Sequence, residues 1–198
     1  MDVRFCDDFG PDGFGWIVDE SMTRTSHVLA AEGKVWLVDA VDWPDAIDRA
    51  LTLGEPAGVL QLLDRHNRDC AAIAERLGVP HVVAPDALPG SPFEFVPVMR
   101  RNRWQESALW WPETRTLVVA EALGTNRYYT ARKVPIAVHL LLRLTPPRVL
   151  ATFQPDRVLV GHGEALHGSE TAGAVLHALR TSRRGLPGVL VRLPLAGR

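Results

Sequence analysis

Apolar runs of strand length alternate with helical segments over residues 34–84, and this alternation constrains the fold more than any other feature of the sequence. A short apolar run bounded by polar residues fits a buried strand better than a helix. Apolar residues that recur every three or four positions instead form the buried stripe of a helix. The three strand-like runs are Lys34 to Asp39, Val59 to Leu63 and His81 to Ala84. Together with the helices between them, they predict an α/β chain with mixed sheets.

Residues typical of helix starts and ends support a helix in each of the two segments between these runs. The first helix has Asp42 as its expected cap and Pro44 in its first turn. The second helix runs from Cys70 to Leu77, and Gly78 is expected to end it. The apolar stripe of the first helix consists of Ala46, Ile47, Ala50 and Leu51.

The rest of the chain extends the same pattern on both sides. Phe14 to Val18 and His27 to Ala30 are further strand-like runs near the start. The elements expected in the second half are a hairpin of Ala108 to Trp111 and Leu117 to Ala120, a helix over Val134 to Leu144, a helical turn from Pro146-Pro147 to about Phe153, a strand over Val158 to Val160, a last helix capped by Ser169 and ended by Gly185, and an edge strand over Val189 to Leu193.

Composition places these elements in one globular domain, 1–198. The chain has 198 residues, of which 46% are hydrophobic and 23% charged, and no repeat or low-complexity linker divides it. A net charge of -1 provides no general attraction for nucleic acid or an anionic membrane. The two cysteines imply no disulfide framework. Because the first residues lack a leader pattern and no apolar run reaches the roughly 20 residues of a membrane span, we expect a cytoplasmic protein.

Three of the expected strand ends carry ionisable residues, and ligand sites of α/β proteins lie beyond the carboxyl ends of strands. The first end is the loop from Asp64 to Cys70. The second is Glu121, and the third is Gly161-His162-Gly163. Carboxylate, thiolate and imidazole groups are the ligands that zinc uses. The pattern therefore predicts a site for a metal ion or a small ligand where these ends converge.

The order and spacing of five segments resemble the metallo-β-lactamase superfamily over nearly the whole chain. The family's early hairpin, its "LIDxG" strand, its metal-ligand loop and helix, its hairpin ending in "GD" and its late "PGHG" element each have a counterpart here. The counterparts are Arg24 to Leu29, Val35 to Asp39, Val59 to Leu77, Leu109 to Leu117 with Ala120-Glu121-Ala122-Leu123, and Val158 to Gly163. The resemblance implies an αββα four-layer sandwich of two mixed β-sheets flanked by helices.

The metal-ligand loop departs from the family pattern. Fully active members carry H-x-H-x-D-H in this loop, a third His in a "GHTPG"-like segment, the Asp of "GD" and the late His. In the register that we prefer, Asp69 and Cys70 stand at the last Asp and His of the first motif. Arg65 and Asn67 then stand at its first two histidines. The third His is missing from the corresponding stretch, Asn102 to Ser107.

A second register of the same loop stays open. In it, Asp64 and His66 take the two histidine positions, Asp69 replaces the last His, and Arg68 stands at the Asp. In either register the first metal position is lost. The residues that replace its histidines do not form a complete set of metal ligands, and arginine offers no lone pair to a metal. A two-metal centre is therefore not expected.

Two interpretations of the remaining positions compete. In the first, one zinc ion would be held by Asp69, Cys70, Glu121 and His162. Such an ion lowers the pKa of a bound water or polarises a carbonyl, and Asp69 would orient or deprotonate that water as the catalytic residue. In the second, no metal binds and a guanidinium, of Arg65 or Arg68 with Arg65 preferred, fills the vacated volume and pairs with Asp69 and Glu121.

The resemblance leads to three functional hypotheses. The first is a non-catalytic or weakly catalytic protein with a degenerate metal site and a pocket for a small ligand or partner. The second is a mononuclear zinc-dependent hydrolase of a small ester, thioester, amide or phosphoester. The third is a nucleic-acid-binding member, against which the near-zero net charge argues. His139 is interpreted as a core residue, and the sequence leaves a homo-oligomer open. The expected pocket residues are Asp64, Arg65, His66, Asn67, Arg68 and Glu106.

Overall fold

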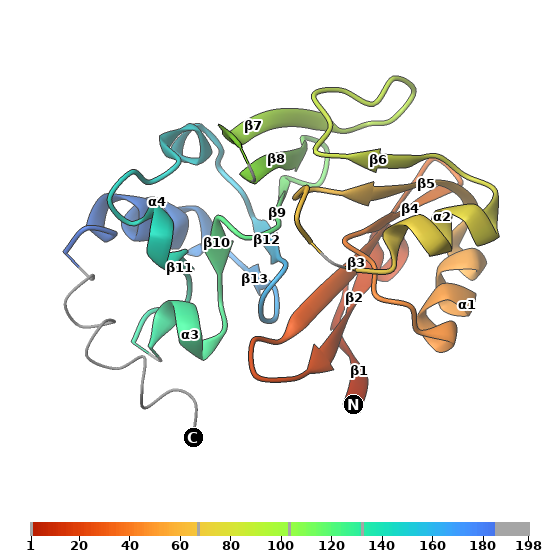
Figure 1. Cartoon of the computed structure of the whole chain (residues 1–198), viewed down its shortest axis with the longest axis horizontal. Helices are drawn as coiled ribbons and strands as arrows, with labels where there is room; N and C mark the ends of the chain where they lie inside the picture. Colours follow the sequence, from red (N-terminus) through yellow and green to blue (C-terminus); the bar gives the residue numbers. More distant parts are fainter. Residues whose placement is uncertain (1, 67, 103, 132, 185–198) are drawn as a thin grey trace.

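The computed structural model describes residues 2–66, 68–102, 104–131 and 133–184, which form two mixed sheets with helices on both sides (Figure 1). The first sheet has the strand order β1-β2-β3-β4-β5-β6, and the second has the order β13-β12-β9-β8-β7. A small ribbon joins β10 to β11. Parallel pairing joins β4 to β5, β5 to β6 and β9 to β12, while the other neighbours in the two sheets are antiparallel.

The strands of the first sheet are β1 (Asp2–Asp8), β2 (Gly13–Asp19), β3 (Arg24–Ala31), β4 (Lys34–Val38), β5 (Glu55–Gln61) and β6 (His81–Val83). Those of the second are β7 (Glu94–Arg101), β8 (Trp104–Trp111), β9 (Thr116–Val119), β12 (Arg157–Val160) and β13 (Leu166–His167), and the ribbon consists of β10 (Leu123–Gly124) and β11 (Ala137–Val138). The helices are α1 (Pro44–Leu53), α2 (Cys70–Leu77), α3 (Arg127–Thr130) and α4 (Thr171–Thr181), with short 3-10 helices η1 (Gly10–Asp12), η2 (Leu140–Leu142) and η3 (Arg148–Thr152).

Strand β4 shows how the sequence separates two hydrophobic layers. Successive side chains of a strand point to opposite faces of the sheet. Val35 and Leu37 pack with residues of α1 and α2 on the outer face of the first sheet. Trp36 and Val38 pack with residues of the second sheet, between the two sheets. Figure 1 shows α1 and α2 on one side of the sheets and α3 and α4 on the other. The expected αββα sandwich is therefore the observed architecture.

Most of the strand-like runs lie inside observed strands. The runs at 14–18, 27–30 and 34–39 correspond to β2, β3 and β4, and the run at 59–63 overlaps the end of β5. The expected hairpin corresponds to β8 and β9, and α2 spans Cys70–Leu77 as predicted. The strands β1 and β7 were not expected: β1 alternates polar and apolar residues, and the apolar stretch of β7 contains Pro97, which is unusual inside a strand.

The helix predicted over Val134 to Leu144 is wrong. The chain instead forms β11 and then η2, because the segment turns sharply between them. His139 stands at the turn and its Nδ1 accepts a hydrogen bond from the Leu141 N–H. The Arg143 side chain then donates to the Val138 carbonyl. These bonds satisfy the backbone without a continuous α-helix.

Two predicted caps are also wrong. Asp42 does not cap α1, whose N-cap is Trp43, because both carboxylate oxygens of Asp42 accept from Arg76 on α2 instead. Ser169 lies outside the cap of α4, since that helix begins at Thr171 with Glu170 as its N-cap. Gly185 and the edge strand over Val189 to Leu193 lie outside the described residues.

No helix among the described residues is long and apolar enough to cross a membrane.

Candidate functional site

The candidate site lies where the segments that follow β4, β5, β9 and β12 meet. The segment after β5 contacts the other three. Arg68 donates to carbonyl oxygens at the ends of β4 and β12, and Arg65 pairs with Glu121 after β9. Strand ends from both sheets therefore converge at one edge of the sandwich, as the sequence predicts.

Arg68 connects the two sheets at this edge by hydrogen bonds to three backbone carbonyls. Its Nη1 donates to the carbonyls of Thr25 and Asp39, the latter at 2.9 Å, and its Nη2 donates to the Gly161 carbonyl at 2.9 Å. Burial lowers the pKa of Arg68, and the neighbouring Asp39 opposes this change. The guanidinium thus ties both sheets together by its hydrogen bonds, and it places a fixed positive charge within the site.

Next to Arg68, His66 and Asp39 form a buried acid–imidazole pair. The Nδ1 atom of His66 lies 3.3 Å from Oδ1 of Asp39, and the Nε2 atom is buried with no hydrogen-bond partner among the described residues. Asp39 adopts a left-handed backbone conformation with φ of 47°, which a short polar side chain tolerates. Burial alone would raise the pKa of Asp39, but His66, Arg68 and the Leu62 N–H hold it below its ordinary value.

His162 faces the same pair from the end of β12. Its Nδ1 donates to the Thr23 carbonyl at 2.9 Å, which leaves Nε2 as the acceptor nitrogen of a neutral ring. The ring lies 5.8 Å from that of His66 and stacks on Tyr129 at 5.9 Å. Burial, with the positive charge of Arg68, lowers the pKa of His162 to about 4. His162 is therefore neutral at physiological pH.

Glycines on both sides fix the turn that carries His162. A Cβ atom on Gly161 would lie 2.3 Å from the Ala120 carbonyl oxygen. Gly163 has a φ of +112°, which side chains other than glycine rarely adopt, and a Cβ there would meet Thr125 at 2.2 Å. The sequence Gly161-His162-Gly163 thus presents the imidazole because no larger residue fits beside it.

Glu121 is held between a guanidinium and an imidazole. Its Oε2 accepts from Arg65 at 3.0 Å, and its Oε1 lies 3.3 Å from Nε2 of His139. The Arg65 guanidinium also stacks on the Trp104 ring, 3.9 Å from its centre. Burial would raise the pKa of Glu121, but His139 and Arg65 outweigh it and keep the pKa below its ordinary value. The carboxylate is therefore ionised and already paired.

Glu106 is fully buried, and its carboxylate accepts hydrogen bonds from the backbone at Glu121. Its Oε1 accepts from the N–H groups of Glu121 and Ala122 at 2.9 and 2.8 Å, and its Oε2 accepts from the Trp104 indole at 3.1 Å. Burial raises the pKa of Glu106 although these donors oppose it. The predicted pocket residue Glu106 is thus a positioning residue behind the site.

We expect Glu106→Gln to lower the free energy of unfolding by roughly 1–3 kcal/mol, because an amide nitrogen would face one of these N–H donors and leave it unsatisfied. Glu94→Gln is the matched control: Glu94 is exposed at the start of β7, and its replacement should stay within about 0.5 kcal/mol of the wild type. Urea unfolding measures both variants. Equal stabilities of the two would contradict the role of Glu106.

The structure does not bring Asp69 and Cys70 to the other predicted ligands. The exposed Asp69 carboxylate accepts from the Asp42 N–H at 2.8 Å, and the buried Cys70 thiol points to the Ala40 carbonyl. Burial, with the negative charge of Asp39, raises the pKa of Cys70 to about 12, so the thiolate that zinc requires is disfavoured.

These positions decide how well the predicted zinc fits. Among the described residues, no group of three or more His, Cys, Asp and Glu side chains is arranged to hold a metal ion. Glu121 is engaged by Arg65, and Arg68 places a second cation beside His162. The expected four-ligand set is therefore not assembled. Zinc binding itself stays a prediction.

Arg65 makes one of the two contacts predicted for it. It pairs with Glu121 as predicted, but not with Asp69, whose carboxylate accepts from the Asp42 N–H just before α1. Of the other pocket residues, Asp64 accepts from the Gln105 N–H and so ties its loop to β8, and Asn67 lies outside the described residues.

Sequence reasoning missed three residues of the site. Asp39 was noted only as the end of a strand, although a carboxylate directly after a buried strand is itself a signal for a site. His139 was assigned to the core because the surrounding apolar run was interpreted as a helix. Tyr129, whose hydroxyl donates to the Glu121 carbonyl at 3.0 Å, was not expected at this site.

Several solved structures are similar to this chain. The crystal structure of DIM-1 metallo-β-lactamase aligns with a TM-score of 0.65 and 10% identity, over 95% of this chain and 98% of that one. A metallo-β-lactamase from Pontibacter korlensis aligns with a TM-score of 0.59 and 13% identity, over 90% and 99%. VMB-1 aligns with a TM-score of 0.60 and 6% identity, over 95% and 98%.

No family model matches the sequence, and no curated protein matches it. The likeness therefore lies in the arrangement of the elements rather than in the residues, and identities this low carry the fold alone. The alignment of the two mixed sheets and their flanking helices covers nearly the whole length of these structures. This chain has the metallo-β-lactamase fold.

Proposed function

We propose that this chain is a hydrolase-like protein with the metallo-β-lactamase fold that binds a small ligand at the candidate site without a metal ion. The observation that carries this proposal is the pairing of Glu121 with Arg65. Glu121 stands where the family resemblance places a metal-ligating carboxylate, and a guanidinium from the metal-ligand loop already neutralises it. A guanidinium replaces the charge of a metal ion but not its Lewis acidity.

The electrostatics around this pair support the same proposal. Arg65 and Arg68 are two cations on one loop, and each contacts groups at the strand ends. A divalent ion placed among them would meet repulsion at short range. The side chain of Arg65 is 40% exposed, so a ligand with an acceptor group is able to reach its guanidinium.

The mononuclear zinc hydrolase remains the second candidate because of one observation. The Nε2 atom of His66 is buried and unpartnered, and His162 is adjacent with its own Nε2 free to accept. Buried polar groups without partners require an explanation, and an unfilled ligand position is one. The experiment below separates the two candidates.

Zinc calorimetry together with elemental analysis of protein purified without added metal or chelator tests the proposal. We expect well under one equivalent of metal per chain and no saturable zinc binding at micromolar concentrations. One equivalent of tightly bound zinc that is lost in His66→Gln but kept in His177→Gln, a variant of an exposed histidine on α4, would instead establish the second candidate.

The variant Arg65→His should increase zinc affinity by at least about tenfold, because a nitrogen donor replaces a repelling charge beside Glu121. Its stability should fall by less than about 1 kcal/mol, since the ion pair that it removes is partly exposed. Calorimetry and thermal melts on the same preparations measure both effects. An unchanged zinc affinity would show that the guanidinium does not block the site.

A further inference from the structure

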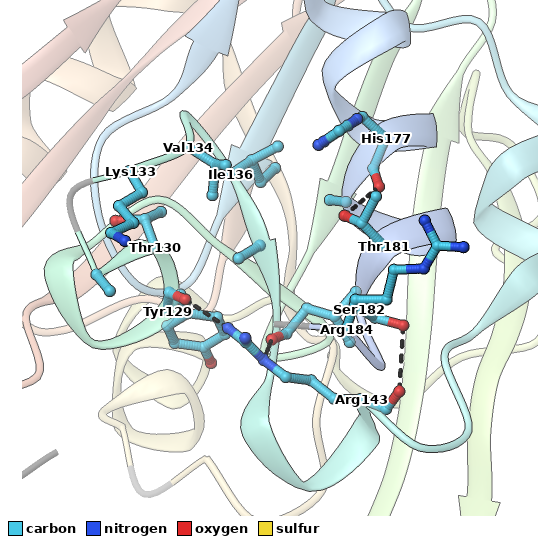
Figure 2. A pocket seen from close by; sticks show the side chains of 14 residues that line it. Tyr129, Thr130, Lys133, Val134, Ile136, Arg143, His177, Thr181, Ser182 and Arg184 are labelled. Carbon is cyan, nitrogen blue, oxygen red and sulfur yellow. Dashed lines mark hydrogen bonds between the residues drawn. The ribbon is translucent and has the colours of Figure 1, made fainter. Parts of the chain in front are cut away.

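A cavity of about 300 Å³ lies beside Tyr129, between residues 133–138 and the end of α4 (Figure 2). Its apolar wall is formed by Val134, Ile136 and Val138 together with Ala178 of α4. Its size falls at the lower end of the range for small-molecule pockets. Tyr129 also contacts His162 and Glu121, but the other lining residues take no part in the candidate site, so the cavity calls for a separate explanation.

The charged residues of the cavity all have the same sign. Figure 2 labels Arg143, Lys133, His177 and Arg184 around it, and its described lining contains no aspartate or glutamate. A cavity with an apolar wall and basic groups alone fits a ligand that has an apolar body and an anionic end.

Arg143 is the buried member of this set. It is 5% exposed, its Nε donates to the Val138 carbonyl at 3.1 Å, and its Nη2 donates to the Tyr129 carbonyl at 2.6 Å. No carboxylate pairs with it in the part of the chain that the structure describes, and burial lowers its pKa with no acidic neighbour to oppose the change. Two carbonyl dipoles hold the guanidinium in place, but its charge has no counter-ion. Buried arginines are usually paired.

We propose that this cavity binds a small organic carboxylate, with its carboxylate against Arg143 and its hydrocarbon chain against Ile136 and Val138. The carboxylate would supply the missing counter-ion through charge-assisted hydrogen bonds. The hydrocarbon chain would contact the apolar residues that line the cavity. This site is separate from the one in the proposed function and stands or falls independently of it.

Calorimetric titration of the full chain with octanoate and with octanamide tests the charge requirement. The two probes have the same hydrocarbon chain and nearly the same shape, and they differ in the charge of the head group. We expect octanoate to bind at least about tenfold more tightly than octanamide, and we expect Arg143→Gln to remove that preference. Arg180→Gln removes a positive charge from an exposed position of α4 outside the cavity lining, and should keep it.

A second variant protects the test against misfolding of Arg143→Gln. Ala178→Leu keeps every charge but adds volume at a residue of the apolar wall, and it should weaken both probes by roughly tenfold or more. Circular dichroism establishes which variants are folded. The proposal is overturned if octanoate does not bind the wild type, if both probes bind it equally, or if folded Ala178→Leu binds them unchanged.

Discussion

Replacing Arg68 by methionine should lower the free energy of unfolding by about 3 kcal/mol or more. The variant keeps much of the aliphatic volume but leaves the carbonyls of Thr25, Asp39 and Gly161 without their donor. Each unsatisfied buried acceptor costs roughly 1–3 kcal/mol, although some of them will recover a water. For a chain of this length, the loss corresponds to a fall of about 6 °C or more in Tm.

Arg65→Met is the matched control for Arg68→Met. It removes the same side chain from the same loop, where the guanidinium is partly exposed and pairs with a single carboxylate. We expect it to cost less than about 1 kcal/mol. Urea unfolding of the three proteins compares the two positions directly. If both variants lose the same small amount, Arg68 does not hold the two sheets together.

The stability of the protein should fall steeply between pH 6.5 and about pH 4 because of His162. In the unfolded chain its imidazole titrates near 6.5, and in the folded protein its pKa is about 4 because burial and the charge of Arg68 oppose protonation. Within this window the imidazole is protonated in the unfolded chain but neutral in the folded protein. Acidification therefore favours unfolding. At about 1.4 kcal/mol per pKa unit, the full loss from this group is about 3 kcal/mol.

Comparison with His162→Gln isolates this contribution. Glutamine keeps an N–H donor near the Thr23 carbonyl but does not titrate, so its pH profile should be flatter than that of the wild type by about 3 kcal/mol over the window. The control His177→Gln replaces an exposed histidine of α4 and should follow the wild-type profile. Unfolding free energies at half-unit pH steps supply the comparison. Parallel profiles of His162→Gln and wild type would contradict the prediction.

The strands that form the site could be predicted from the sequence better than the side-chain contacts within the site. Strands such as β4, β9 and β12 are buried on both faces or nearly so, and burial of this kind produces the apolar runs that mark them. The segment at 134–144 was mistaken for a helix because a short apolar run does not distinguish a helix from a strand followed by a turn. That error hid His139, which the turn places against Glu121.

The partners of the predicted site residues depend on contacts that sequence spacing does not encode. The direction of an arginine side chain is one example. Arg65 and Arg68 lie three positions apart, yet one lies across the Trp104 ring at the opening and the other reaches three carbonyls inside. Asp69 illustrates the same point, because its carboxylate was expected at the site and instead receives the N–H of Asp42. Packing of the two sheets decided these directions.

The acceptors of Arg68 also bear on the order of events in folding. The Gly161 carbonyl is 93 positions from Arg68 in the sequence, and the Thr25 carbonyl is 43 positions away in the other direction. Contacts between such distant segments require long loops to close first, so the guanidinium gains all three acceptors only after both sheets have docked. An interaction completed after the folding transition state slows unfolding without speeding folding. Arg68 therefore governs the lifetime of the folded protein rather than the rate at which it forms.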